Sequence, residues 1–342
     1  MSKSRDIEFG NLICKFGDND LLDFYEEVVR PAFFDNKLKR KYATTGYFFR
    51  DVELVSLGEI NGDLVVGIAG VFVYDTSLKR TQYFDSEANE IVHSVHSIKS
   101  SPTAKFLLIL NNHRLVYYRD VPNSPSLNQF RATFEYFLKK KNSAYISSLY
   151  DISLSAAKEA GKTRANPTKA QLIEMYPMPK VTLNPLTCSD EIGAFVNRFS
   201  VINDIKIIFT KTNSEQDNKG LFAGIQSTQI FVGSEKSELR HHSTEGLSID
   251  ASKSHIIAAS EQGNQFVSLT GKDKVGNALK GNNEDFQLKV KSNFIGDGVN
   301  YVAKSLFGVF KGLVSTGSIV IPDTPEKVRL LIVRLISEIK NV

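Results

Sequence analysis

The sequence predicts an α+β protein with two domains, a β-rich N-terminal sheet domain followed by an α/β domain with C-terminal helices. Three observations lead to this expectation. The chain has 342 residues, which is more than a single hydrophobic core usually organises. Alternating, β-branched and aromatic segments dominate the first half and favour strands. In the second half, a strand–helix–strand pattern gives way to apolar residues at helical spacing.

The β-rich domain is predicted to span residues 1–140. An apolar side on the segment from Asp20 to Arg30 indicates a helix, and Asn61-Gly62 indicates a tight turn between two strands. A second helix is expected from Ser126 to Lys140, where large apolar residues recur at helical spacing. Strands are expected at residues 46–60, 63–76 and 79–86, with a hairpin at 104–120.

Residues 141–179 are predicted to form a helical connector, in which Asn166-Pro167 starts a helix with the proline at its first position. An α/β sheet domain is predicted for residues 180–293 and helices for 294–342. The expected strands of the sheet domain are 180–186, 204–212 and a closing hairpin of 265–271 with 284–292. The expected helices are 189–199, 248–263, 294–313 and 328–339.

Composition and charge are those of a globular protein, with 42% apolar and 23% charged residues. The net charge of +4 is too small by itself to imply a nucleic-acid partner. Its distribution is uneven, however. Residues 1–90 contain 11 basic and 16 acidic residues, whereas 131–169 contain 8 and 3, and 289–342 contain 8 and 4. Such asymmetry can steer an anionic partner toward the basic segments.

The two cysteines, Cys14 and Cys188, are far apart, so they have no metal-ligand spacing and imply no disulfide framework. The chain starts without an apolar signal region, and no run reaches about 18 apolar residues. We therefore expect a cytoplasmic protein without a transmembrane segment. Cys188 precedes a predicted helix start, where a thiolate would be stabilised, but a capping or packing role is the simpler explanation.

The triplet Gly161-Lys162-Thr163 matches the last three residues of a phosphate-binding loop, but the residues before it do not match the start of such a loop. Such a loop needs another glycine at the position occupied here by Ala156, because that glycine makes the turn that aims backbone amides at phosphate. The preceding segment is predicted to be helical instead of a buried strand. Nucleotide binding at this triplet is therefore not expected, and the sequence indicates no cofactor.

No metal site is predicted either. Asp323 and Glu326 suit the start of a helix, and His93 and His96 lack a third ligand at a suitable spacing. Four carboxylates flank predicted strand ends without an assigned basic partner: Asp51, Glu53, Glu59 and Asp63. A divergent metal-dependent nuclease remains an alternative, because such enzymes need spaced carboxylates and a lysine at strand ends.

Basic residues gather in two segments that contain few carboxylates. The longer segment contains Lys139, Lys140, Lys141, Lys158, Lys162, Arg164 and Lys169. The shorter one contains Lys37, Lys39, Arg40 and Lys41. Flexible lysines suit contacts to phosphates, which provide affinity without reading a base sequence. The alternative is a solvated face that keeps the protein soluble, since no zinc-finger, ribonucleoprotein or helix-turn-helix pattern accompanies them.

The C-terminal apolar segments offer a second kind of function. Gly308 to Gly312 has the G-x-x-x-G spacing, but Lys304 and Lys311 interrupt the apolar stretch, which excludes a membrane-spanning dimer face. If the chain is a protein-interaction module, Leu306 and Phe310 are the positions expected to dock a partner or a second copy.

The order of these elements resembles the RexA-like and KwaB-like proteins of prophage exclusion and antiviral defence operons. Three stretches carry the resemblance: residues 105–138, 180–217 and 256–273. It implies a two-domain cytoplasmic protein, often a homodimer, that binds DNA with little sequence preference and acts with a partner protein in sensing phage. The sequence analysis therefore favours a non-catalytic DNA-binding protein of a defence system, with the interaction module and the nuclease as alternatives.

Overall fold

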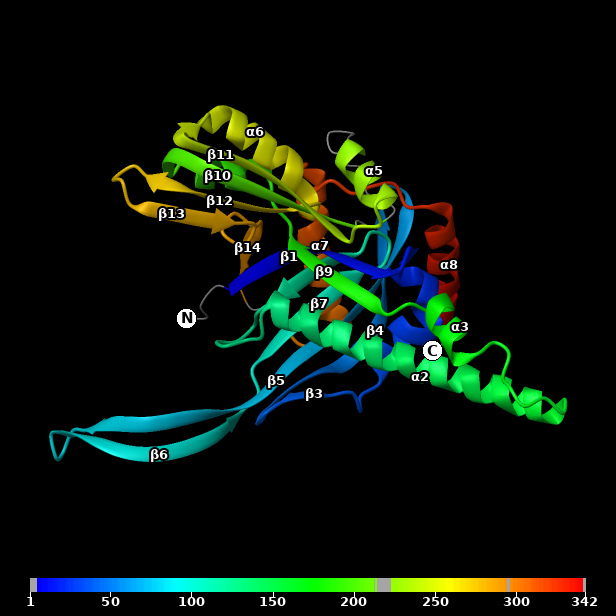
Figure 1. Cartoon of the computed structure of the whole chain (residues 1–342). Helices are drawn as coiled ribbons and strands as arrows, with labels where there is room; N and C mark the ends of the chain where they lie inside the picture. Colours follow the sequence, from blue (N-terminus) through cyan, green and yellow to red (C-terminus); the bar gives the residue numbers. More distant parts are fainter. Residues whose placement is uncertain (1–4, 212, 214–222, 294–295, 341–342) are drawn as a thin grey trace.

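The computed structural model describes residues 5–211, 213, 223–293 and 296–340. It confirms the α+β class, with a curled ten-stranded antiparallel sheet, a long helix, a four-stranded antiparallel sheet and two C-terminal helices (Figure 1). Thr212 and Phe294, which end and begin two predicted elements, lie outside the described residues. Within the described residues, no helix is long and apolar enough to cross a membrane.

The first sheet has the strand order β14-β1-β8-β7-β5-β4-β3, with β2 and β9 also paired to β1 and β6 paired to β5. The predicted turn at Asn61-Gly62 is present, with both residues at positive φ, and it joins β4 to β5. The strands are β1 (Arg5–Phe16), β2 (Asn19–Asp20), β3 (Arg40–Tyr42), β4 (Thr45–Ile60), β5 (Asp63–Asp85), β6 (Glu90–Ser100), β7 (Thr103–Ile109), β8 (Arg114–Tyr118), β9 (Pro179–Pro185) and β14 (Lys289–Ser292).

The sheet is buried on both faces. Side chains alternate along β7, so Phe106 and Leu108 point into one core while Leu107 and Ile109 point into another. The first core is shared with α1 (Arg30–Phe34), α2 (Leu127–Glu159) and α8 (Glu326–Lys340), and the second with α7 (Val299–Ser315). This double burial explains the unbroken apolar run that predicts the hairpin.

Three predicted helices differ in detail. The segment expected from Asp20 to Arg30 is split into a 3₁₀ turn η1 (Leu21–Phe24), a π turn η2 (Tyr25–Val29) and α1, because Pro31 has no amide hydrogen to continue a regular ladder. The helix expected to end at Lys140 continues to Glu159 as α2. Helix α3 (Lys169–Met175) begins after Thr168, whose side chain caps Gln171, instead of at Asn166-Pro167.

The second sheet has the order β11-β10-β12-β13, and α4 (Ser189–Val196) and α6 (Ile249–Ser260) share its apolar core. Its strands are β10 (Phe199–Thr210), β11 (Lys236–Leu247), β12 (Phe266–Asp273) and β13 (Ala278–Asn282). Helix α5 (Ala223–Phe231) and the 3₁₀ turn η3 (Glu261–Gly263) complete it. Strands β11 and β13 and helix α5 were not predicted.

The second sheet is inserted between two strands of the first. The strand predicted at 180–186 and the one predicted at 284–292 both belong to the first sheet, as β9 and β14. Strand β1 is long enough to pair with β14 through Arg5–Glu8 and with β9 through Gly10–Phe16. The hairpin expected between 265–271 and 284–292 is therefore formed by β12 and β13 instead.

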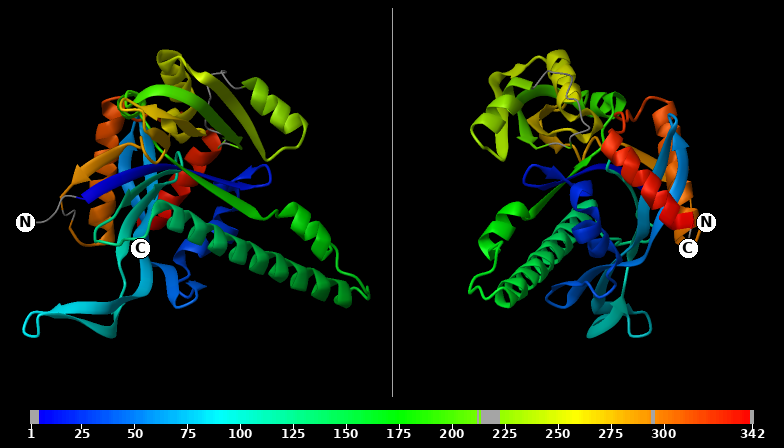
Figure 2. Two further views of the ribbon diagram at one scale, coloured as in Figure 1. Left: turned by 60° about the vertical axis from the view of Figure 1, so that its left-hand side comes forward. Right: turned by 90° about the vertical axis from the view of Figure 1, so that its right-hand side faces the viewer.

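Two elements project from the body. Figure 1 shows α2 extending past the first sheet with α3 beside its distal half, and the β5–β6 hairpin extending in another direction. The turned views of Figure 2 show the same two projections. Within the described residues, β6 pairs only with β5, so this hairpin lies outside both cores.

Candidate nucleic-acid interface

Helix α2 sets the position of most of the predicted cations. Its start is fixed by Ser126, whose hydroxyl accepts a hydrogen bond from the Gln129 amide at 3.3 Å. Phe130, Phe134 and Phe137 are fully buried against the sheet, and each contributes about 1.5–3 kcal/mol by burial. At 100° per residue, Lys140 lies roughly 90° around the helix from the centre of this stripe. It therefore stands at the flank of the buried face, and its side chain is exposed.

The structure brings the two predicted basic segments together. Lys141 Nζ lies 2.6 Å from Asp35 Oδ2, which ties the middle of α2 to the loop that precedes Lys37. Arg40 donates to Thr133 Oγ1 at 3.3 Å and stacks over the Tyr47 ring. We call Lys37, Lys39, Arg40, Lys41, Lys139, Lys140 and Lys141 the proximal basic cluster.

Carboxylates neutralise part of the proximal basic cluster. Lys139 pairs with Glu135, Lys141 with Asp35 and Lys39 with Asp75. The pKa of the Asp35 carboxyl is lowered chiefly by its hydrogen bond from Lys141. Lys37, Lys41 and Lys140 are exposed, and no described carboxylate lies within ion-pair distance of them. These three are the cations that a phosphate could approach without displacing another anion.

The remaining predicted cations lie at the far end of α2. We call Lys158, Lys162, Arg164 and Lys169 the distal basic cluster, and all four are exposed. Lys140 and Lys158 are separated by roughly 27 Å along the helix axis at 1.5 Å per residue. The prediction of one continuous basic segment therefore becomes two clusters at the middle and the tip of the projecting helix.

The Gly161-Lys162-Thr163 triplet forms the turn that ends α2. The Gly161 amide donates to Lys158 O at 3.0 Å and the Lys162 amide to Ala157 O at 2.8 Å. Gly161 has a positive φ of 69°, as expected after a helix C-terminus. Since the backbone amides cap the helix, they are not directed at a phosphate.

Leu306 and Phe310 are core residues. Both side chains are fully buried between α7 and the first sheet, so no surface exposes them to a partner. Helix α7 presents its apolar stripe to its own sheet because one face of that sheet would otherwise be open. The apolar periodicity of α7, which suggested docking, thus reflects packing of the helix against its own sheet.

The histidines and cysteines form no metal site that the structure describes. No three His, Cys, Asp or Glu side chains among the described residues lie close enough to hold an ion. His93 and His96 are on strand β6, not on a helix face. Cys14 is fully buried and burial raises the pKa of its thiol, whereas Cys188 is the residue before α4.

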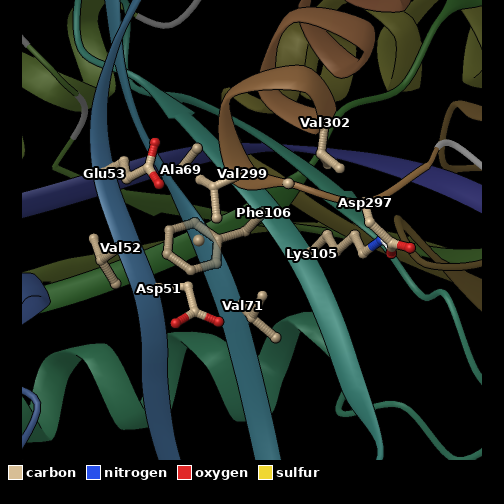
Figure 3. A pocket seen from close by; sticks show the side chains of 12 residues that line it. Asp51, Val52, Glu53, Ala69, Val71, Lys105, Phe106, Asp297, Val299 and Val302 are labelled. Atoms are coloured by element: carbon tan, nitrogen blue, oxygen red, sulfur yellow. Dashed lines mark ion pairs between the residues drawn. The ribbon is translucent and has the colours of Figure 1, made fainter.

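Two of the four unassigned carboxylates share a cavity of about 530 Å³ with a lysine (Figure 3). Asp51 and Glu53 lie at a bulge in β4, and Lys105 reaches the same cavity from β7. Lys105 Nζ is held by Gly296 O at 2.7 Å and by the Asp297 carboxylate at 3.7 Å. Asp63 has a basic partner too, because Arg329 of α8 pairs with it at 3.0 Å. Arg329 is thus a basic partner that sequence reasoning did not assign, whereas Lys105 shares a cavity with Asp51 and Glu53 but pairs with Asp120 and Asp297.

A further basic group was not predicted at all. Lys15, Lys180, Lys211 and Lys236 line one cavity at the junction of the two sheets. They are widely separated in the sequence, and each stands in a strand or strand end without a local run of charge. No sequence signal could have grouped them.

The sequence matches no protein-family model, and no curated protein matches it. The site must therefore be interpreted from its own geometry.

Proposed function

We propose that this protein binds DNA without sequence preference and without catalysis, through the proximal and distal basic clusters. The observation that carries the proposal is the exposure of seven cations on and beside α2 with no described carboxylate at ion-pair distance. They are Lys37, Lys41, Lys140, Lys158, Lys162, Arg164 and Lys169.

The geometry of α2 suits contacts to a phosphate backbone. A helix of 33 residues is about 50 Å long, so cations at its middle and tip can reach phosphates separated by most of a duplex turn. Neutralising phosphates releases counterions and requires no base reading. The proposal also includes a cytoplasmic location, an antiviral defence operon and a partner protein from that operon. These three parts are implied by the resemblance in the order of elements.

The test is the reversal of the three unpaired cations of the proximal basic cluster, Lys37→Glu, Lys41→Glu and Lys140→Glu together. Binding to two unrelated duplexes is measured by fluorescence anisotropy across a salt series. The affinity should fall at least about tenfold for both duplexes, and the slope of log K against log salt should decrease by about 3, roughly one for each phosphate contact.

The matched control is Lys304→Glu, an exposed lysine on α7 far along the chain from both clusters, which should leave binding unchanged. A loss confined to one duplex would contradict sequence-blind binding. Cleavage of either duplex that requires magnesium would instead favour the nuclease alternative.

Self-association is the second candidate function, and the β5–β6 hairpin is the observation that favours it. Leu78 pairs with Ile98 and Phe84 with Ile91, and these four side chains are 51–68% exposed. Leu78 and Phe84 are an even number of residues apart on β5, and the bulge between Arg80 and Gln82 places the extra residue on β6, so all four share one face. An isolated two-stranded hairpin is marginally stable in water, so this face is suited to packing against another surface.

A second copy of the chain fits the hairpin by charge. The outer part of the hairpin, residues 81–98, contains Asp85, Glu87 and Glu90 and no Lys or Arg, whereas Lys79, Arg80 and Lys99 lie nearer the sheet. Residues 156–170 contain the distal basic cluster and only one acid, Glu159. In a two-fold dimer each hairpin could contact the distal basic cluster of its partner, because such an interface is self-complementary. DNA and a second copy would then compete for the same cations.

A further inference from the structure

A cavity of about 340 Å³ lies where the two sheets meet. Strands β1 and β9 supply one side and the ends of β10 and β11 the other. One part of its lining is apolar and consists of Ile13, Pro177 and Met178. The remaining part is polar and consists of Lys15, Lys180, Lys211, Lys236, Thr182, Thr210 and Glu235. The lining therefore combines an apolar wall with four cations, two hydroxyls and one carboxylate.

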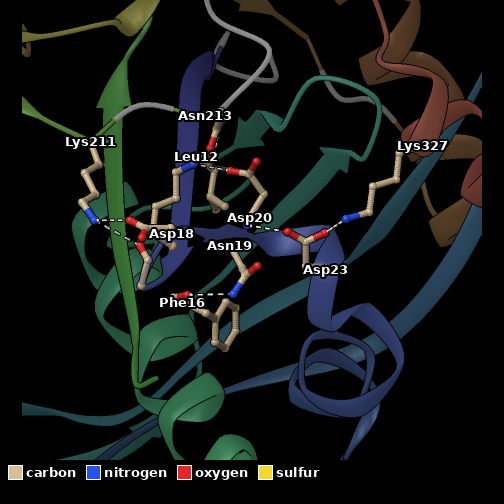
Figure 4. Close-up of polar contacts among 11 residues, drawn as sticks. Leu12, Phe16, Asp18, Asn19, Asp20, Asp23, Lys211, Asn213 and Lys327 are labelled. Carbon is tan, nitrogen blue, oxygen red and sulfur yellow. Dashed lines mark hydrogen bonds and ion pairs between the residues drawn. The ribbon is translucent and has the colours of Figure 1, made fainter. Parts of the chain in front are cut away.

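The four lysines come from four separate segments, and carboxylates hold all of them. Lys15 Nζ lies 2.5 Å from Asp20, and Lys180 pairs with Glu235. Lys211 Nζ lies 2.8 Å from Asp18, as Figure 4 shows, and Lys236 Nζ lies 2.8 Å from Glu238. Of these four carboxylates only Glu235 lines the cavity, so the lysines are neutralised mainly by carboxylates outside its lining.

Two of these ion pairs are easily replaced. The side chain of Asp18 is 98% exposed and that of Glu235 is 70% exposed. Hydrogen bonds from their lysines lower the pKa of both carboxyls, so both are charged at neutral pH. Because exposed ion pairs add little stability, a ligand that supplies a more highly charged anion can take over the lysines. A phosphate monoester does so, with about two negative charges and three acceptor oxygens.

We propose that this cavity binds a small organic phosphate of mononucleotide size. Lys180, Lys211 and Lys236 contact the phosphate, and the apolar wall packs against the organic part. The volume lies near the lower end of the roughly 300–1,000 Å³ typical of small-molecule sites, which is enough for a single nucleotide. This site is separate from the basic clusters of α2 and does not depend on DNA binding there. A free nucleotide and the terminal phosphate of a nucleic acid strand share the chemistry it recognises.

The experiment compares two lysines that share one partner. Lys236 and Lys206 both lie 2.8 Å from Glu238, but only Lys236 lines the cavity. Binding of adenosine 5′-monophosphate, adenosine and inorganic phosphate is measured by calorimetry on the full chain. The wild type and Lys206→Met should bind the monophosphate equally, and Lys236→Met at least about tenfold more weakly. Adenosine and inorganic phosphate should each bind more weakly than the monophosphate. Adenosine lacks the contacts of the phosphate with the lysines, and inorganic phosphate lacks the contacts of the organic part with the apolar wall.

Thermal unfolding without ligand checks that Lys236→Met is folded, which is expected because the Lys236 side chain is 53% exposed. A short oligonucleotide, measured with and without a 5′-phosphate, shows whether the ligand is a free nucleotide or the end of a nucleic acid strand. Tighter binding of the phosphorylated strand than of the same strand without its 5′-phosphate, in the wild type and not in Lys236→Met, supports the site with a strand end as its ligand. The proposal is overturned if the monophosphate does not bind, if inorganic phosphate binds as tightly, or if both lysine variants lose affinity equally.

Discussion

Phenylalanine is the main large core residue of this tryptophan-free chain, and several of its side chains form an aromatic cluster in the first core. The ring centroids of Phe33 and Phe134 are 4.4 Å apart, and those of Phe106 and Phe130 are 5.2 Å apart in an edge-to-face arrangement. Aromatic pairs of this kind contribute about 0.5–1.5 kcal/mol beyond their buried area. The cluster joins α1 and α2 to the sheet, and it therefore fixes the direction in which the cations of α2 point.

A histidine pair in the second sheet predicts a dependence of stability on pH. His241 Nε2 and His255 Nε2 lie 3.2 Å apart, between β11 and α6. Burial, and then the neighbouring His241, lower the pKa of His255 below its ordinary value of 6.5. The neutral form is thus favoured in the folded state. The resulting stability is present above pH 6.5 and is lost as the pH falls through the folded-state pKa.

The variant His255→Gln should reduce this dependence, because glutamine does not titrate. Thermal unfolding is recorded between pH 7.5 and pH 5, conditions chosen to bracket the ordinary histidine pKa of about 6.5. The midpoint should fall less with decreasing pH in His255→Gln than in the wild type. His93→Gln, at an exposed histidine of the β5–β6 hairpin, should retain the full dependence. Equal slopes for all three proteins would show that the pair does not act as described.

At the scale of elements, the two projections differ in how they are attached: α2 packs against the first core, whereas the β5–β6 hairpin does not. The first half of α2 is anchored by buried phenylalanines, whereas its distal half is held by α3. Ser153 Oγ donates to Pro167 O at 3.2 Å and Asn142 Nδ2 donates to Tyr176 O at 3.1 Å, which ties the returning segment to the helix. The β5–β6 hairpin has no comparable anchor among the described residues. It presents its apolar face to solvent.

Because the hairpin lies outside the cores, substitutions there can test association without disturbing folding. The double variant Phe84→Ser and Ile91→Ser should leave the unfolding midpoint within a few degrees of the wild type, since both residues are 60% exposed. If a second copy occupies the hairpin, light scattering should show a wild-type dimer and a monomeric variant. Leu330→Ser, at a residue of α8 that is 64% exposed, is the control and should remain dimeric. A monomeric wild type, or a variant that still dimerises, would refute this mode of association.

At the scale of the whole molecule, the second sheet is joined to the first beside strand β1, and we call this junction the neck. Leu288 N donates to Leu186 O at 2.7 Å where the chain leaves and re-enters the first sheet. Two buried amides reinforce the neck, because Asn11 Nδ2 and Asn184 Nδ2 both donate to Gly263 O, at 3.1 Å and 3.0 Å. The cavity with four lysines lies beside this junction, so its shape depends on how firmly the sheets are joined.

Removing one neck amide should weaken the whole protein. Asn184→Ala removes one of the two donors to Gly263 O and the donor to Asn264 O. This loss should lower the free energy of unfolding by about 1 kcal/mol. Chemical denaturation followed by two probes, one in each sheet, measures the effect. Asn203→Ala removes a hydrogen bond to Ser243 O inside the second sheet at a partly exposed site, and its cost should be smaller. A larger loss in Asn203→Ala would contradict the importance of the neck.

The sequence by itself determined the class of the fold and the type of most elements. Helix and strand periodicity depend on neighbours within a few residues, so the β4–β5 turn, the β7–β8 hairpin and α8 were predictable. The exposure of Lys140 did not follow from this periodicity, because residues three apart lie on the same side of a helix and Phe137 is buried. Boundaries were less predictable, as the continuation of α2 past Lys140 shows.

Only the tertiary structure decided which distant segments meet. The pairing of β9 and β14 with β1 depends on long-range hydrogen bonds that leave no local pattern, so the insertion of the second sheet was not predictable. For the same reason Leu306 was mistaken for a docking position, since periodicity reveals an apolar face but not its partner. The meeting of Lys15, Lys180, Lys211 and Lys236 around one cavity follows from those pairings. Charge that is scattered along a chain becomes a site only when the strands that carry it are brought side by side.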